Sequence, residues 1–93
     1  MIKNWKKEKE WTIQGQWAVR YYNSISMLQL QVSKYREADD FDKAMKKDYD
    51  WHGKWYVNIW NSDKQKTKLF TSKRDAVAFA SNYMKNNPKG WFK

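Results

Sequence analysis

The chain has 93 residues and a mass of 11.4 kDa, which is enough for one hydrophobic core and excludes a multidomain protein. It contains no cysteine, and this excludes disulfides, thiolate catalysis and cysteine-based metal centres. Nineteen Lys and Arg against ten Asp and Glu give a formal charge of +9, an excess that favours a polyanionic partner.

The aromatic content indicates a folded chain despite a mean hydropathy of −1.12. Seven tryptophans and six tyrosines contribute to an aromatic share of 18%, which is high for a disordered protein. No window approaches the roughly 20 apolar residues of a membrane-spanning helix. We therefore expect a single soluble domain over residues 1–93, located in the cytoplasm and with no membrane partner.

Residues 1–10 contain four lysines and no apolar stretch, and they predict a basic N-terminal arm that either grips phosphates or remains solvated. An internal repeat follows, with copies at 11–48 and 49–87 and a tail at 88–93. Residues 11–24 align without gaps on residues 49–62. The identical pairs are Gly15/Gly53, Trp17/Trp55, Val19/Val57, Asn23/Asn61 and Ser24/Ser62.

Each copy has the pattern of a strand, a turn, a second strand and a helix. In the first copy, Ser33 is the expected helix N-cap. The residues expected on the inner face of that helix are Ala38, Phe41 and Met45. Acidic residues at the start of this helix and lysines at its end suit the helix dipole, so we interpret them as a solvated face and expect no metal site.

In the second copy, the first strand shows a period of two: Trp55, Val57 and Ile59 alternate with Tyr56, Asn58 and Trp60. A polar turn at 61–64 leads to a strand at 67–70. Ser72 then has the position of an N-cap, with an acidic residue three positions later. The helix that follows carries an apolar stripe and ends before Pro88. The stripe consists of Ala76, Val77, Ala80, Tyr83 and Met84.

These elements predict an α+β fold in which two tandem strand-strand-helix repeats form an antiparallel sheet of about four strands with two helices on one face. The side chains expected to face the helices are Trp17, Val19, Tyr21, Trp55, Val57 and Ile59.

The opposite face then carries aromatic rings interleaved with cations, which is typical of a surface that stacks bases and neutralises phosphates. The candidate nucleic-acid-binding residues are Arg20, Tyr22, Tyr56, Asn58, Trp60, Lys64, Lys66, Lys68, Phe70 and Arg74. The alternative is that the segment around Trp5, the tail with Trp91 and Phe92, or a second subunit covers these rings.

The run Lys54-Trp55-Tyr56-Val57-Asn58-Ile59-Trp60, followed by a lysine-rich turn and Lys68-Leu69-Phe70-Thr71-Ser72-Lys73-Arg74-Asp75-Ala76, carries a resemblance to known families. Residues 51–87 resemble the sheet-plus-helix DNA-binding domain of plant ethylene-response factors and the arm-binding domains of phage and transposon tyrosine recombinases. The resemblance implies a three-stranded sheet in the DNA major groove, backed by a helix. It places Tyr56, Asn58, Trp60, Lys66 and Lys68 on the DNA side. The chain as a whole looks like a small bacteriophage accessory protein.

No catalytic constellation accompanies the single histidine, His52, so we expect neither an enzyme nor a cofactor. The leading interpretation is a non-catalytic nucleic-acid-binding protein, of a phage type, with DNA ahead of RNA as the partner. The alternative is a phage-encoded, anti-CRISPR-like inhibitor whose aromatic face binds a host enzyme or a nucleoprotein defence complex. A self-associating structural protein is a third reading.

Overall fold

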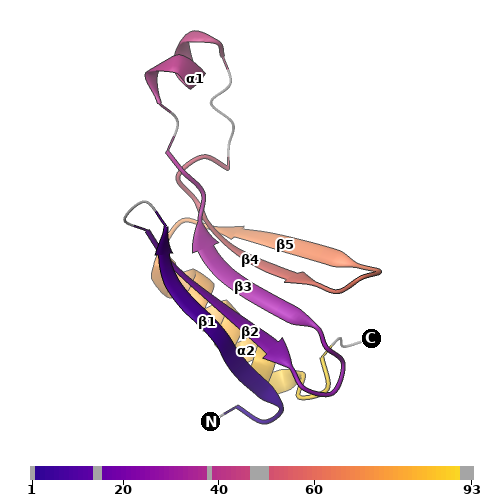
Figure 1. The fold of residues 1–93 in the computed structure, drawn as a ribbon. Coiled ribbons are helices and arrows are strands. Elements are labelled where there is room, and N and C mark those ends of the chain that lie inside the picture. Colours follow the sequence, from indigo (N-terminus) through magenta and orange to yellow (C-terminus); the bar gives the residue numbers. More distant parts are fainter. Residues whose placement is uncertain (1, 14–15, 38, 47–50, 91–93) are drawn as a thin grey trace.

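In the computed structural model, which describes residues 2–13, 16–37, 39–46 and 51–90, a five-stranded antiparallel sheet carries one long helix on one face (Figure 1). The strands lie side by side in chain order, β1-β2-β3-β4-β5. The elements are β1 (Trp5–Ile13), β2 (Gln16–Asn23), β3 (Gln29–Lys34), α1 (Asp40–Ala44), β4 (Trp55–Trp60), β5 (Gln65–Phe70) and α2 (Lys73–Asn86). After β1, the element order is strand, strand, helix, and then again strand, strand, helix.

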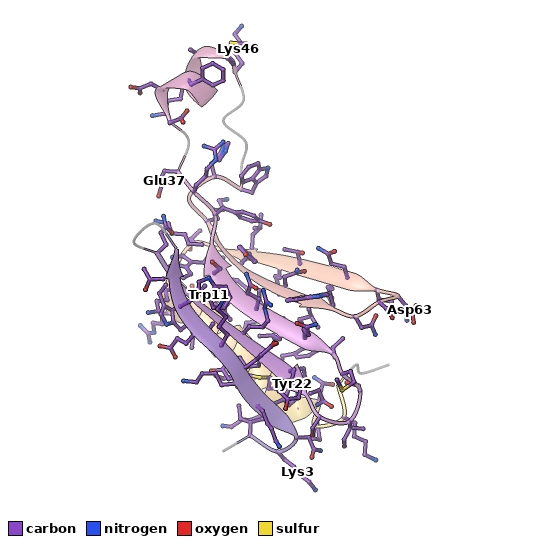
Figure 2. The ribbon with its side chains drawn as sticks, in the orientation of Figure 1. Lys3, Trp11, Tyr22, Glu37, Lys46 and Asp63 are labelled. Carbon is purple, nitrogen blue, oxygen red and sulfur yellow. The ribbon has the colours of Figure 1, made fainter. Side chains whose placement is uncertain are left out.

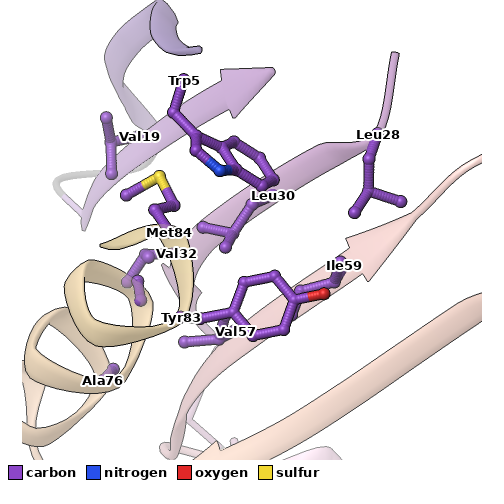
Figure 3. Close-up of a cluster of buried hydrophobic side chains, with 11 residues drawn as sticks. Trp5, Val19, Leu28, Leu30, Val32, Val57, Ile59, Ala76, Tyr83 and Met84 are labelled. Carbon is purple, nitrogen blue, oxygen red and sulfur yellow. The ribbon is translucent and has the colours of Figure 1, made fainter. Parts of the chain in front are cut away.

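The hydrophobic core lies between the sheet and α2, and Figure 3 shows it in close-up. Its fully buried sheet and loop residues are Val19, Leu28, Leu30, Val32, Val57 and Ile59. The partly buried rings of Trp17, Tyr21 and Trp55 pack against this cluster. The predicted inward sets of β2 and β4 are therefore confirmed, because alternate residues of a strand share one face.

Helix α2 begins and ends where the sequence predicts. The Ser72 hydroxyl accepts a hydrogen bond from the Asp75 amide at 3.1 Å, which satisfies one of the free amides of the first turn. The predicted stripe is the buried side of the helix, with Ala76, Ala80, Tyr83 and Met84 buried. The helix ends at Asn86, two residues before Pro88.

The prediction of four strands and two packed helices is wrong. Helix α1 has five residues and lies at the far end of an extension that projects beyond the sheet and is described at residues 35–37, 39–46 and 51–54 (Figure 1). Its Phe41 is 68% exposed, and Met45, just past its end, is 54% exposed. Ser33 caps no helix but lies buried within β3, and Ala38 is outside the described residues. A helix of one turn with so few apolar side chains would bury too little surface against the sheet to offset the entropy lost in holding it there.

The expected N-terminal arm is instead the first strand. Residues 5–13 pair with β2, with a bulge between Lys7 and Lys9. Trp5 is 4% exposed and lies on the helix side, where its ring meets Tyr83 edge-on at 6.3 Å. Its indole Nε1 donates to the Asn87 carbonyl at 2.9 Å. This tryptophan occupies part of the sheet face that was assigned to a second helix.

The chain after α2 is tied back to the first two strands. The side-chain amides of Asn4 and Asn23 both donate to the Pro88 carbonyl, at 3.0 and 2.9 Å. The Asn23 Oδ1 also accepts from the amides of Ile25 and Ser26, so that this fully buried side chain organises the β2–β3 turn. Residues near both ends of the sequence therefore help to close the core.

Candidate nucleic-acid interface

The pairing register determines which side chains share the sheet face turned away from α2, called the open face below. Directly opposed residues of antiparallel strands project on the same side. One row crosses all five strands and is polar throughout: Lys9, Arg20, Gln31, Asn58 and Thr67. The row on one side of it contains Tyr22 and Trp60, and the row on the other side contains Trp11 and Tyr56. Figure 2 labels Trp11 and Tyr22 on this face.

Arg20 lies at the centre of the open face between two indole rings. Its guanidinium carbon is 5.4 Å from the ring centroid of Trp11 and 5.5 Å from that of Trp60. The Gln31 Oε1 accepts from Arg20 Nε at 3.1 Å and from Arg20 Nη2 at 2.8 Å. These bonds use two of the five guanidinium N–H groups, so a permanent charge is held in place with donors left for an anion. Lys9 adds a second cation 5.0 Å from the Trp11 centroid.

A run of ring contacts leads from the open face towards the extension. Gln31 Nε2 donates to the Tyr56 hydroxyl at 2.9 Å. The Tyr56 ring lies 4.5 Å from that of Tyr35, which lies 5.0 Å from Trp51. Burial raises the pKa of the Tyr35 phenol above 10.0, with a smaller contribution from Tyr56. The phenol therefore stays neutral near pH 7 and brings no negative charge to the surface.

A shallow hollow of about 230 Å³ opens on this face beside the Tyr35 and Tyr56 rings. Ser33, which is 7% exposed, is among the residues that line it. The remaining lining residues are polar or basic: Gln16, Gln31, Lys34 and Arg36. Such a hollow can receive a flat polar group whose rim meets amide and cationic donors.

Charge is segregated between the sheet body and the extension. Residues 1–34 and 55–93 contain fourteen of the basic residues and four of the acidic ones, a net charge of +10. Residues 35–54 contain five basic and six acidic residues, a net charge of −1. The field around the sheet is therefore strongly positive and attracts polyanions to it.

The structure brings together only half of the predicted site. Arg20, Tyr22, Tyr56, Asn58 and Trp60 share the open face. Lys66 pairs with Ile59, Lys68 with Val57 and Phe70 with Trp55, so these three side chains lie on the helix side of β5. The resemblance-based placement of Lys66 and Lys68 beside Tyr56 is therefore wrong. Lys64 precedes β5, and Arg74 lies exposed in the first turn of α2.

The open-face residues absent from the predicted site include Trp11, Gln31 and Tyr35. Trp11 was missed because residues 5–13 were not recognised as a strand. Gln31 in β3 and Tyr35 just after it were missed because neither residue belongs to a recognisable motif. The available signal was the alternation of Gln29 and Gln31 with Leu30 and Val32, which predicts one apolar and one polar face. Trp5 does not cover the open face, because it lies on the helix side; Trp91 and Phe92 are outside the described residues.

Within the described ranges, no group of three or more His, Asp and Glu side chains is arranged to hold a metal ion. No helix in that part of the chain is long and apolar enough to cross a membrane. No protein-family model, curated protein or solved structure matches the chain.

Proposed function

We propose that the protein is a non-catalytic nucleic-acid-binding protein that holds a single strand across the open face. The observation that carries this proposal is the placement of Arg20 between Trp11 and Trp60, in a polar row flanked by aromatic rows. Bases stack on aromatic side chains for about 1–3 kcal/mol each, while cations neutralise the phosphates. β1 and β4 are three strand spacings apart, about 14 Å, which gives room for a short run of nucleotides.

A single strand suits this face better than a duplex. The bases of a duplex are stacked on one another, so their flat faces do not meet the rings of a sheet. The aromatic residues of the open face are all partly exposed, and their neighbours are amides and cations. Amide groups of Gln31 and Asn58 provide both donors and acceptors for the edges of unpaired bases.

The test measures fluorescence anisotropy of a labelled 20-nucleotide oligothymidine, its RNA equivalent and a 20-base-pair duplex at low salt. Trp60→Leu should weaken single-strand binding about 5- to 150-fold, corresponding to the loss of one stacked base. Trp17→Leu is the matched control because Trp17 is partly buried on the helix side. Arg20→Gln should lower the slope of log affinity against log salt by about 0.7.

Two results would refute the proposal. One is the absence of any anisotropy change at low salt with all three ligands. The other is an equal loss of affinity in Trp60→Leu and Trp17→Leu, since that would locate binding elsewhere. Circular dichroism of each variant establishes that the sheet is retained.

A second candidate function is supported by the extension. Phe41 and Met45 are more than half exposed at its tip, in the segment 35–54 that contains six of the ten acidic residues. Exposed apolar side chains of this kind mark protein contacts. We infer as the alternative that the tip binds a protein, as an inhibitor of a host enzyme or nucleoprotein complex would. Cross-linking in host lysate should then recover a nuclease-resistant partner, and Phe41→Ser with Met45→Ser should abolish recovery.

A further inference from the structure

The two edges of the sheet differ in length and in charge pattern. Among the described strands, β1 and β5 each pair on one side only, so each leaves a row of backbone N–H and C=O groups without a strand partner. β5 has six residues, and its charged side chains are all lysines. β1 has nine residues, with three lysines and two glutamates between its two tryptophans. Two copies of β5 would therefore repel each other, whereas β1 carries both signs of charge and can pair with a second β1.

The β1 edge is accessible to a second chain. Figure 1 shows β1 at the border of the sheet, and the main sheet contacts of α2 are with β3, β4 and β5. Residues 6–10 are all exposed. Lys7 and Glu10 form an ion pair at 2.9 Å, with about half of each side chain still exposed. Glu8 and Lys9 belong to no ion pair within the described part of the chain.

The bulge in β1 puts charges of opposite sign on the same face of the sheet. Lys7 and Glu10 both lie on the helix side, where they form their ion pair. Lys9 lies on the open face, and Glu8, which has no partner in β2, lines a hollow beside Tyr22 on that same face. Glu8 and Lys9 are consecutive residues, and in a regular strand they would point to opposite faces. The bulge removes this alternation at one point of the edge.

We propose that β1 pairs antiparallel with β1 of a second copy, about a twofold axis that passes between Glu8 and Lys9 and runs perpendicular to the sheet. This register sets Glu8 opposite the partner's Lys9 on the open face, and Lys7 opposite the partner's Glu10 on the helix side. An axis in this direction keeps the faces of both sheets aligned, so opposed residues must share a face, and the bulge meets this condition. A register shifted by one residue opposes Glu8 to the partner's Glu8, and Lys7 to the partner's Lys9, which brings like charges together.

The same register adds contacts at both ends of the charged segment. On the open face, Lys6 lies opposite the partner's Trp11, where a cation can meet an indole ring. On the helix side, Trp5 lies opposite the partner's Thr12. A largely apolar hollow of about 430 Å³ lies beside this end of β1. Its lining residues are Ile2, Trp5, Lys6, Lys7, Tyr21 and Met84. The partner's strand runs along this hollow and removes apolar surface from water.

The pairing joins two five-stranded sheets into one and sets the two open faces side by side. It does not depend on nucleic-acid binding, because its contacts are between protein side chains and backbone groups. The formal charge of +9 on each copy opposes association, so the complementary pairs decide whether the two edges remain together.

The test is sedimentation equilibrium of the nuclease-treated chain at rising concentration, up to about 1 mM, where weak pairing is detected. The mass should rise towards that of a dimer. Glu8→Lys and Lys9→Glu should each weaken association about 2- to 30-fold, because the twofold axis makes each substitution turn two attractive pairs into repulsive ones. The combined variant, Glu8→Lys with Lys9→Glu, restores opposite charges and should associate within about twofold of the natural chain. Lys64→Glu, which makes the same change of charge just before β5, is the matched control.

Amide hydrogen exchange locates the contact. Exchange in residues 6–10 should slow as the concentration rises, whereas exchange in residues 65–69 should stay the same. Trp60→Leu should leave association unchanged, so the failure of nucleic-acid binding and the failure of pairing are distinguished by separate measurements.

The proposal is overturned if the mass stays that of one chain up to about 1 mM. It is also overturned if Lys9→Glu strengthens association, as relief of the net positive charge alone would do. A combined variant as weak as its single parents would show that Glu8 does not face the partner's Lys9. A loss in Lys64→Glu equal to that in Lys9→Glu, or slower exchange in residues 65–69 alone, would place the contact at another edge.

Discussion

Replacing Trp5 by alanine should remove a large part of the protein's stability, although the residue lies in a segment whose sequence is dominated by Lys and Glu. Trp5 is 4% exposed, contacts Tyr83 edge-on, and donates its indole N–H to the Asn87 carbonyl. The substitution therefore empties part of the core and leaves a backbone acceptor without its donor.

The expected loss follows from area and from the hydrogen bond. A tryptophan buries about 150–250 Å², which at about 25 cal/mol per Å² gives an upper estimate of about 4–6 kcal/mol. Measured Trp→Ala losses in cores are about 3–5 kcal/mol, and we expect this range for Trp5→Ala. Trp5→Phe keeps most of the ring and loses mainly the N–H donor, at about 0.5–1.5 kcal/mol from the bond.

The assay is urea unfolding followed by far-ultraviolet circular dichroism, because removing a tryptophan alters the fluorescence signal itself. Trp11→Ala is the matched control: it deletes the same side chain from the same strand, on the open face. Trp11 has cation–π contacts with Lys9 and Arg20 and is partly exposed, so its loss should cost less than about 2 kcal/mol. Equal losses for Trp5→Ala and Trp11→Ala would refute the assignment of β1 to the core.

Three further predictions concern local contacts. Ser72→Ala removes the α2 N-cap and should cost about 0.5–2 kcal/mol, measured as a lower melting temperature. Asn23→Ala removes three hydrogen bonds, including the one to the Pro88 carbonyl, and should cost about 2–4 kcal/mol in urea unfolding, whereas a cost under about 1 kcal/mol would contradict their role. The hydrogen bond from Lys7 holds the pKa of the Glu10 carboxyl below its ordinary 4.5. Because the folded-state pKa is the lower one, this stabilisation is present above pH 4.5 and is lost as the pH falls through the folded-state pKa, so unfolding of Glu10→Gln should depend less on pH in acid than that of the natural chain.

The parts of the fold that could be predicted are those with a local pattern. The alternation from Trp55 to Trp60 defines a strand and its two faces by itself. The spacing of the apolar stripe from Ala76 to Met84, with the serine cap before it, does the same for α2. These signals need no knowledge of what pairs with them, because side-chain period and capping chemistry depend on a few neighbouring residues.

The predictions that failed concern features that depend on pairing between strands distant in the sequence. In β5, neither alternate set of residues is clearly apolar, since Lys66, Lys68 and Phe70 alternate with Gln65, Thr67 and Leu69. A shift of one residue in register reverses every side chain, so only the pairing with β4 assigns the faces. β1 was missed for a related reason: an edge strand with charged side chains has the composition of a solvated tail.

The arrangement of the core separates the residues that stabilise the fold from those of the proposed binding face. The residues of the hydrophobic core cluster lie on the helix side, where Trp5 and α2 close the core. On the open face, the rings of Trp11 and Trp60 have Arg20 and not aliphatic side chains as their central neighbour. A sheet built only for stability would place small polar residues there, because exposed rings add an association risk without closing a core. Substitutions of open-face rings should therefore change ligand affinity far more than unfolding free energy, and the reverse should hold for Trp5.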